Sequence, residues 1–67
     1  MSLTLKLNGE PFQLEGEPYI INLLRQATIE GRFVVALNGE LLPREDYEVK
    51  VLTAQDQVDI LFPIAGG

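Results

Sequence analysis

The stretch LTLKLNGEPFQLE (residues 3–15) carries the clearest structural signal in this 67-residue chain. Apolar and polar residues alternate on both sides of Asn8-Gly9, which is the period-two pattern of half-buried strands. Asn-Gly is also the dipeptide preferred in a two-residue type I′ hairpin turn, because both central residues need a positive φ. A turn at this point would bring apolar side chains onto one face of the hairpin. The expected pairs are Leu5 with Phe12 and Leu3 with Leu14.

The next segment, PYIINLLRQA (residues 18–27), changes to a helical period. Its apolar residues are spaced i, i+3, i+4 and i+7 and form one stripe on a helix. We expect Pro18 at the first helical position, where its missing N–H is no loss. Gly31 is expected to end the helix in the left-handed conformation. The apolar stripe consists of Ile20, Leu23, Leu24 and Ala27.

A second hairpin is predicted in RFVVALNGELLP (residues 32–43). The continuous apolar run from Phe33 to Leu37 is typical of a buried strand, and a second Asn-Gly follows at Asn38-Gly39. Pro43 should prevent a regular ladder from continuing. The REDY segment that follows is expected to form a turn or a single helical turn.

Two further segments alternate in the last third of the chain. YEVKVL (residues 47–52) would place Tyr47, Val49 and Val51 on one face of a strand. VDILF (residues 58–62) is the last predicted strand, with Leu61 on the face opposite the core. The core face of that strand is assigned to Val58, Ile60 and Phe62.

These elements predict the order strand, strand, helix, strand, short strand, strand. A helix with one apolar stripe needs one sheet face to cover it, which favours an α+β fold with a mixed sheet of four to five strands packed on one helix. We expect a single domain over residues 1–63. Residues 64–67 would be a flexible C-terminal diglycine tail, because Pro63 lacks the N–H that would continue a ladder.

The tail IAGG (residues 64–67) could carry chemistry, or it could be an idle, disordered end. Glycines lack Cβ and can pass through a channel that is too narrow for other residues. The α-carboxylate of Gly67 is ionised at neutral pH. It could attack the α-phosphate of ATP in the active site of a partner and give an activated acyl adenylate.

The composition excludes several classes of function. The chain has no Cys and no His. It therefore lacks a thiol or imidazole nucleophile, and it also lacks the usual ligands of a structural zinc site. Ten acidic residues against five basic residues give a net charge of −5, which disfavours nucleic acid and favours an electropositive protein groove. We expect no membrane span, no signal peptide and a cytoplasmic location.

VALNGELLPRED (residues 35–46) and DQVDILFPIAGG (residues 56–67) together resemble the ThiS family of bacterial thiamine sulfur carriers. The resemblance implies a ubiquitin-like β-grasp fold and a carrier that is not itself an enzyme and binds no cofactor. A ThiF- or MoeB-type adenylating enzyme would use ATP and Mg²⁺ to adenylate the carboxylate of Gly67. Sulfur from a donor such as a cysteine desulfurase would then give a thiocarboxylate, which a ThiG-type thiazole synthase would consume. Gly66 and Gly67 would be the functional tail residues.

The resemblance leaves other members of the same fold open. These are the small sulfur-carrier subunit of molybdopterin synthase, another ubiquitin-like carrier or protein modifier, and a plain binding domain. The chain length and the PRE segment (residues 43–45) fit the thiamine branch better.

Partner contacts are expected close to the tail. Leu61 could dock a partner, although a single exposed leucine is also ordinary. Leu41 and Leu42 could extend the same patch, while at least one of them should fill the core. The cluster Arg44, Glu45 and Asp46 fits either a turn-stabilising role or recognition. The candidate partner-binding residues are Leu42, Leu61, Pro63, Ile64 and Ala65.

Overall fold

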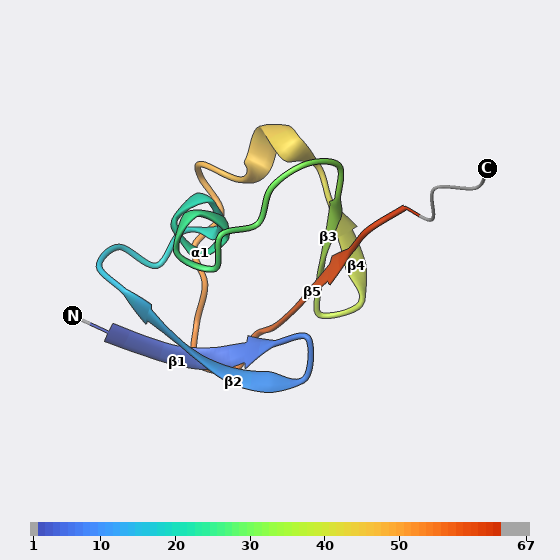
Figure 1. Cartoon of the computed structure of the whole chain (residues 1–67). Coiled ribbons are helices and arrows are strands. Elements are labelled where there is room, and N and C mark those ends of the chain that lie inside the picture. The colour runs from blue at the N-terminus through green and yellow to red at the C-terminus, as the bar shows by residue number, and fades with distance from the viewer. Residues whose placement is uncertain (1, 64–67) are drawn as a thin grey trace.

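The computed structural model describes residues 2–63, in which one α-helix packs on a mixed five-stranded sheet (Figure 1). The strand order is β2-β1-β5-β3-β4, with β1 and β5 parallel and the other described pairs antiparallel. This arrangement confirms the predicted α+β fold, while the predicted tail lies outside the described residues. The elements are β1 (Ser2–Leu7), β2 (Glu10–Glu15), α1 (Ile20–Gln26), β3 (Val34–Leu37), β4 (Glu40–Leu42), the 3₁₀ turn η1 (Arg44–Asp46) and β5 (Gln57–Leu61).

The first hairpin has the register that its turn predicts. Leu5 lies opposite Phe12, and Leu3 lies opposite Leu14. Asn8 has φ 52° and Gly9 has φ 84°, as a type I′ turn requires. Leu5 and Leu14 are buried, so the hairpin presents its apolar face to the core.

The helix α1 begins at Ile20, so the prediction that Pro18 opens the helix is wrong. Tyr19 has an extended backbone and forms an isolated antiparallel bridge with Val51. The Pro18 carbonyl accepts a hydrogen bond of 2.6 Å from the Leu52 N–H. Because this backbone pairing needs an extended conformation, the chain turns into the helix only after Tyr19.

The left-handed residue that ends the helix is Thr28. The sequence predicts Gly31 in this role, and that prediction is wrong. Thr28 has φ 57°, and its N–H donates to the Arg25 carbonyl at 3.2 Å. The Ile29 N–H donates to the Leu24 carbonyl at 2.9 Å. These two bonds satisfy the last carbonyls of the helix in a Schellman arrangement. Gly31 is also left-handed, but it lies in the loop that follows.

The predicted strand over residues 47–52 is wrong. The N–H groups of Val49 and Lys50 both donate to the Asp46 carbonyl, at 3.2 and 2.9 Å, so this backbone forms local turns. Tyr47 is buried, whereas Val49 and Val51 are exposed. The alternation in the sequence therefore does not correspond to one face of a strand.

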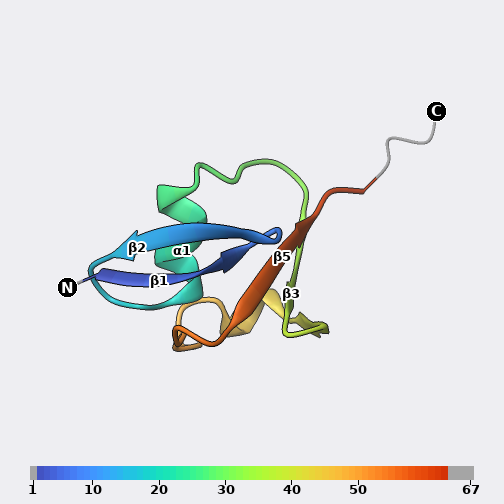
Figure 2. The same cartoon turned by 90° about the horizontal axis from the view of Figure 1, so that it is seen from below.

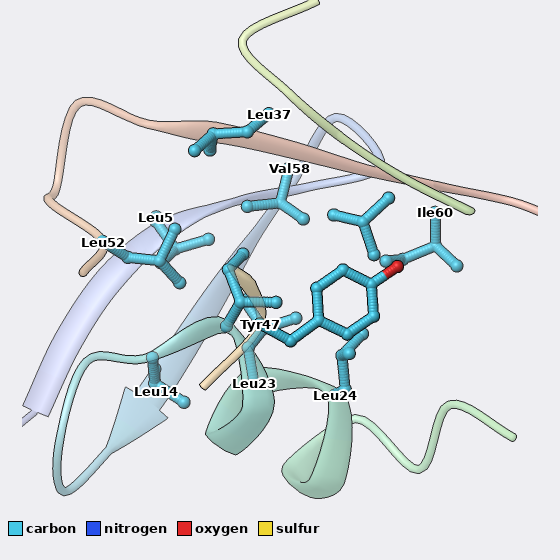
Figure 3. Packing of buried hydrophobic residues seen from close by; sticks show 11 residues of the cluster. Leu5, Leu14, Leu23, Leu24, Leu37, Tyr47, Leu52, Val58 and Ile60 are labelled. Carbon is cyan, nitrogen blue, oxygen red and sulfur yellow. The ribbon is translucent and has the colours of Figure 1, made fainter. Parts of the chain in front are cut away.

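The core lies between the sheet and α1 (Figure 3). Leu23 and Leu24 of the helix point toward Val58 and Ile60 of β5, and the ring of Tyr47 lies among them. The deepest side chains come from both hairpins, the helix and the last strand. They are Leu14, Ile20, Leu23, Val35 and Val58.

Phe62 is not a core residue, contrary to the sequence prediction. β5 ends at Leu61, whose partner Val34 is the first residue of β3, so the ladder stops there. The Phe62 side chain is 56% exposed and meets Phe33 edge-on, with ring centroids 6.5 Å apart. The ring therefore lies at the surface, where the described chain leaves the sheet.

No helix within residues 2–63 is long and apolar enough to cross a membrane.

Candidate functional site

The strand that leads to the C-terminus lies in the middle of the sheet. β5 pairs with β1 on one side and with β3 on the other. In Figures 1 and 2 its C-terminal end lies at the side of the molecule away from the start of β1 and from α1. β1 pairs with the start of β5, and β3 pairs with it as far as Leu61, which fixes the point where the strand ends two residues before Pro63. The candidate residues Ile64, Ala65, Gly66 and Gly67 lie outside the described residues.

The turn residue Asn8 holds β5 beyond the end of the β1 ladder. Its N–H donates to the Val58 carbonyl at 2.8 Å, and its Oδ1 accepts a hydrogen bond from the Ile60 N–H at 2.8 Å. The Ile60 N–H is partly buried, so the bond also satisfies a donor that would be costly to leave unpaired. Asn8 therefore continues the hydrogen bonding of β5 on its β1 side, beyond the last paired residue of β1.

The second turn residue, Asn38, holds the start of β5 from the other side. Its N–H donates to the Gln57 carbonyl at 2.8 Å, and its Oδ1 accepts from the Gln57 N–H at 2.9 Å. From the sequence, both Asn-Gly pairs are predicted to form hairpin turns and nothing more. In a type I′ turn the first residue is left-handed, and here both asparagine side chains reach back to the neighbouring strand.

Asp56 completes the contacts around Asn38. Its Oδ1 accepts from Asn38 Nδ2 at 2.9 Å, and its Oδ2 accepts from the Thr53 N–H at 2.9 Å. Burial alone would raise the pKa of the Asp56 carboxyl. The hydrogen bonds from Asn38 and Thr53, with a smaller effect of the Lys50 charge, outweigh burial and lower the pKa below its ordinary value.

The face of the sheet turned away from α1, here called the outer face, carries exposed apolar residues near the end of β5. Leu61 is 50% exposed, and Val34 lies directly opposite it at 46% exposure. Leu41 of β4 is 70% exposed and lies opposite Ala36 on the same face. The exposure predicted for Leu61 is confirmed.

Leu42 does not lie on the outer face with Leu61. It is paired with Val35, which in turn is paired with Ile60, and both of these are buried against the helix side of the sheet. Leu42 is half-buried and packs on that core. The structure therefore assigns the two neighbouring leucines to different faces, with Leu41 outside and Leu42 inside.

The outer face continues into a shallow cleft of about 330 Å³ where the described chain ends, which we call the tail-base cleft. Its walls combine apolar side chains with two guanidinium groups. Pro63, another candidate contact residue, is exposed on its rim. The lining residues are Arg32, Phe33, Val34, Arg44, Leu61, Phe62 and Pro63.

Residues 2–63 contain no group of three or more acidic side chains arranged to hold a metal ion. Within this range the candidate site consists of an apolar surface and a cleft beside the exit of the last strand.

Comparisons with known proteins agree on one family. The model of the ThiS family matches residues 5–67. The crystal structure of a thiamine biosynthesis protein (ThiS) from Geobacter metallireducens superposes with a TM-score of 0.80 and 29% sequence identity. The match covers 97% of this chain and 100% of that chain, which confirms the expected β-grasp fold. A comparison with curated protein sequences gives no significant match.

Proposed function

This chain belongs to the ThiS family of small sulfur carriers in thiamine biosynthesis, and from this premise we propose that the carboxyl group of Gly67 is the group that carries the sulfur. The observation that supports this best is that the family match extends from residue 5 to Gly67. The body has a compact core, and its central strand leads directly to the diglycine end. The chain would act as a cosubstrate of partner enzymes.

The proposed chemistry begins with activation of the Gly67 carboxylate. A carboxylate is a poor acyl donor, because its negative charge opposes attack on the carbonyl carbon. Attack of its oxygen on the α-phosphate of ATP releases pyrophosphate and gives an acyl adenylate. A ThiF- or MoeB-type partner would bind the ATP and Mg²⁺, because this chain has no glycine-rich phosphate loop followed by Lys.

Sulfur then replaces the adenylate. The terminal sulfur of a persulfide, formed by a donor such as a cysteine desulfurase, attacks the activated carbonyl and AMP leaves. A partner thiol next reduces the sulfur–sulfur bond, leaving a thiocarboxylate on Gly67. A ThiG-type thiazole synthase would accept this sulfur during formation of the thiazole ring.

The outer face would support this cycle as a protein-docking surface. An exposed apolar patch beside a reactive end is well placed to bind the enzyme that acts on that end. Leu61 and Val34 lie opposite one another next to the point where the described chain ends. We infer that they contact the adenylating partner while the tail occupies its active site.

Intact-mass spectrometry tests the proposal. Incubation with ATP, Mg²⁺ and the adenylating enzyme of the same organism should add one adenylate to the chain. Addition of a cysteine desulfurase with cysteine and a thiol reductant should instead give the mass of one oxygen-to-sulfur exchange. Fragmentation should locate that exchange at Gly67. A chain lacking Gly67 is the control, and it should remain folded and unmodified.

The proposal is wrong if the intact chain gains no mass with an enzyme that readily adenylates another carrier. Stable copurification with a large molybdopterin synthase subunit would move the assignment to the molybdopterin branch. Linkage of Gly67 to lysines of other proteins would identify a modifier.

A further inference from the structure

The tail-base cleft concentrates positive charge in an otherwise acidic chain. The net charge is −5, and only five residues are basic. Two of these, Arg32 and Arg44, line the cleft, and none of its lining residues is acidic. The β3–β4 hairpin brings the two together, because Arg32 precedes β3 and Arg44 follows β4 in η1.

Neither arginine is committed to the fold of the described residues. Both side chains are exposed. The side-chain hydrogen bonds within residues 2–63 come from other groups, and neither guanidinium takes part in them. Arg44 also borders a neighbouring hollow whose lining includes Glu45 and Glu48.

The apolar side of the cleft is braced by aromatic contacts. Phe62 meets Phe33 edge-on at 6.5 Å, and Phe33 stacks on Tyr47 with ring centroids 6.3 Å apart. Tyr47 is buried in the core. Because these ring contacts connect the surface to the core, the cleft has an apolar wall supported from the core, beside two exposed cations.

The length of the chain beyond the cleft limits what can bind there. Four residues follow Pro63, and an extended chain of that length reaches roughly 13–14 Å. A nucleotide attacked by the Gly67 carboxylate during adenylation would therefore lie no farther than that from Pro63. An enzyme that encloses so short a tail must also cover the residues around Pro63, which line the cleft.

We propose that the tail-base cleft binds an acidic segment of the adenylating partner, with an apolar side chain seated against Phe62 and Val34 and an adjacent Asp or Glu paired with Arg32 or Arg44. A guanidinium matches a carboxylate with two parallel hydrogen bonds, which adds geometric selectivity to the attraction. This inference rests on the proposed function, because it names the feature by which the adenylating enzyme recognises this carrier. The cations would raise the association rate and fix the orientation of the tail.

Charge reversal tests the proposal. Arg32→Glu and Arg44→Glu are compared with Arg25→Glu, which changes the net charge equally but lies on α1, outside the cleft. The assay is ATP-dependent adenylation of the full chain by the adenylating enzyme of the same organism, with the carrier concentration varied. Each cleft variant should raise KM for the carrier by about tenfold with little change in kcat, whereas Arg25→Glu should stay near wild type. Thermal melting checks that all variants are folded.

Further variants and conditions make the result decisive. Arg32→Gln keeps the side-chain length and should give a smaller rise in KM in the same direction. Raising the salt concentration should raise KM for the wild type and much less for the double variant Arg32→Glu/Arg44→Glu, because that variant lacks the attraction that salt screens. Titration of ATP alone should not shift the NMR signals of Arg32 and Arg44.

Several outcomes would overturn the inference while leaving the carrier function intact. These are an unchanged KM in both cleft variants, an equal rise in Arg25→Glu, and binding of ATP alone at the two arginines. A wild-type chain that is never adenylated would instead contradict the proposed function itself, and the acidic partner segment with it.

Discussion

Asn38 and Asp56 are joined by a hydrogen bond of 2.9 Å from Asn38 Nδ2 to Asp56 Oδ1, across 18 residues of sequence. The Thr53 N–H donates to the other carboxylate oxygen, and Asn38 Oδ1 accepts from the Gln57 N–H. The β3–β4 turn is therefore fastened to the loop that starts β5. This contact therefore fixes the first residue of β5, the strand that leads toward Gly67.

Asp56 should make the stability of the domain depend on pH in the acid range. Its pKa is lowered in the folded state, so its contribution is fully present above the ordinary value of 3.8 and is lost as pH falls through the folded pKa. Asp56→Ala should reduce the free energy of unfolding by about 1–2 kcal/mol near neutral pH. Urea unfolding from neutral to acid pH should show wild type and variant converging below 3.8.

Glu10→Ala provides the control for this experiment. Glu10 is an exposed carboxylate at the start of β2, far from the Asn38 contacts in the sheet order. Its variant should not show the loss of stability near neutral pH that is expected for Asp56→Ala. A gap between wild type and Asp56→Ala that stays constant down to the lowest pH would contradict the assignment.

The two turn asparagines should respond differently to the same substitution. Asn8→Asp keeps the oxygen that accepts from the Ile60 N–H, and Asp tolerates the left-handed backbone, so its effect should be below about 0.5 kcal/mol. Asn38→Asp loses the amide donor and places a second carboxylate against Asp56. It should reduce the free energy of unfolding by about 1–3 kcal/mol near neutral pH.

Chemical denaturation of the two variants measures this difference directly. Asn8→Ala serves as a further comparison, because it removes the oxygen and leaves the partly buried Ile60 N–H unpaired. It should be less stable than Asn8→Asp. Equal losses in Asn8→Asp and Asn38→Asp would mean that the side-chain contact with Asp56 has little effect.

Local signals in the sequence were sufficient for the first hairpin. Alternation and the Asn8-Gly9 turn both indicate one register, in which Leu5 lies opposite Phe12, and the structure has that register. Such agreement arises because a two-residue turn determines every pair that follows it. The helix stripe was also predictable, because its spacing depends only on neighbouring turns of one element.

Local signals in the sequence were not sufficient where the structure depends on residues that are distant in the chain. Tyr47, Val49 and Val51 alternate with polar residues as in a strand. The backbone instead forms local turns, because the Asp46 carbonyl accepts hydrogen bonds from residues that follow it closely. Phe62 continues the alternation of β5, yet β3 has no residue left to pair with it. Whether a strand continues is decided by its neighbour, which a single segment of sequence does not contain.

The faces of Leu41 and Leu42 could have been derived from the second turn. A two-residue turn at Asn38-Gly39 pairs Leu37 with Glu40, which sets Leu41 and Leu42 opposite Ala36 and Val35. Since a buried strand carries apolar residues on both faces, hydrophobicity alone gave no reason to choose. The hydrogen bonds from Asn8 and Asn38 to β5 had no such local signal, because they require the final sheet order.

Leu61 should contribute to partner binding without contributing much to stability. Leu61→Ser removes apolar surface from the outer face beside the end of β5. The variant should raise KM for adenylation by about tenfold, as expected when a central interface residue is truncated, and its melting temperature should stay close to wild type. Enzyme kinetics and thermal melting are measured on the same samples.

Val49→Ser is the matched control for Leu61→Ser. Val49 is also exposed, but it lies in the turn that follows η1 and is not among the residues of the tail-base cleft. Its KM should remain near wild type. If both variants raised KM equally, or neither did, Leu61 would be an ordinary exposed leucine and the outer face would lose its proposed role.

Substitutions of the neighbouring residues Leu41 and Leu42 should have different effects, one on partner binding and the other on the stability of the fold. Leu42→Ala removes packing from the core beside Val35 and should reduce the free energy of unfolding by about 1–3 kcal/mol, less than for a fully buried leucine. Its KM for adenylation should change little once the protein is folded. Leu41→Ala should have the opposite profile, with nearly normal stability and a raised KM, because Leu41 lies on the outer face. Urea unfolding and adenylation kinetics together distinguish the two, and a raised KM in Leu42→Ala alone would place the partner on the core side of this strand.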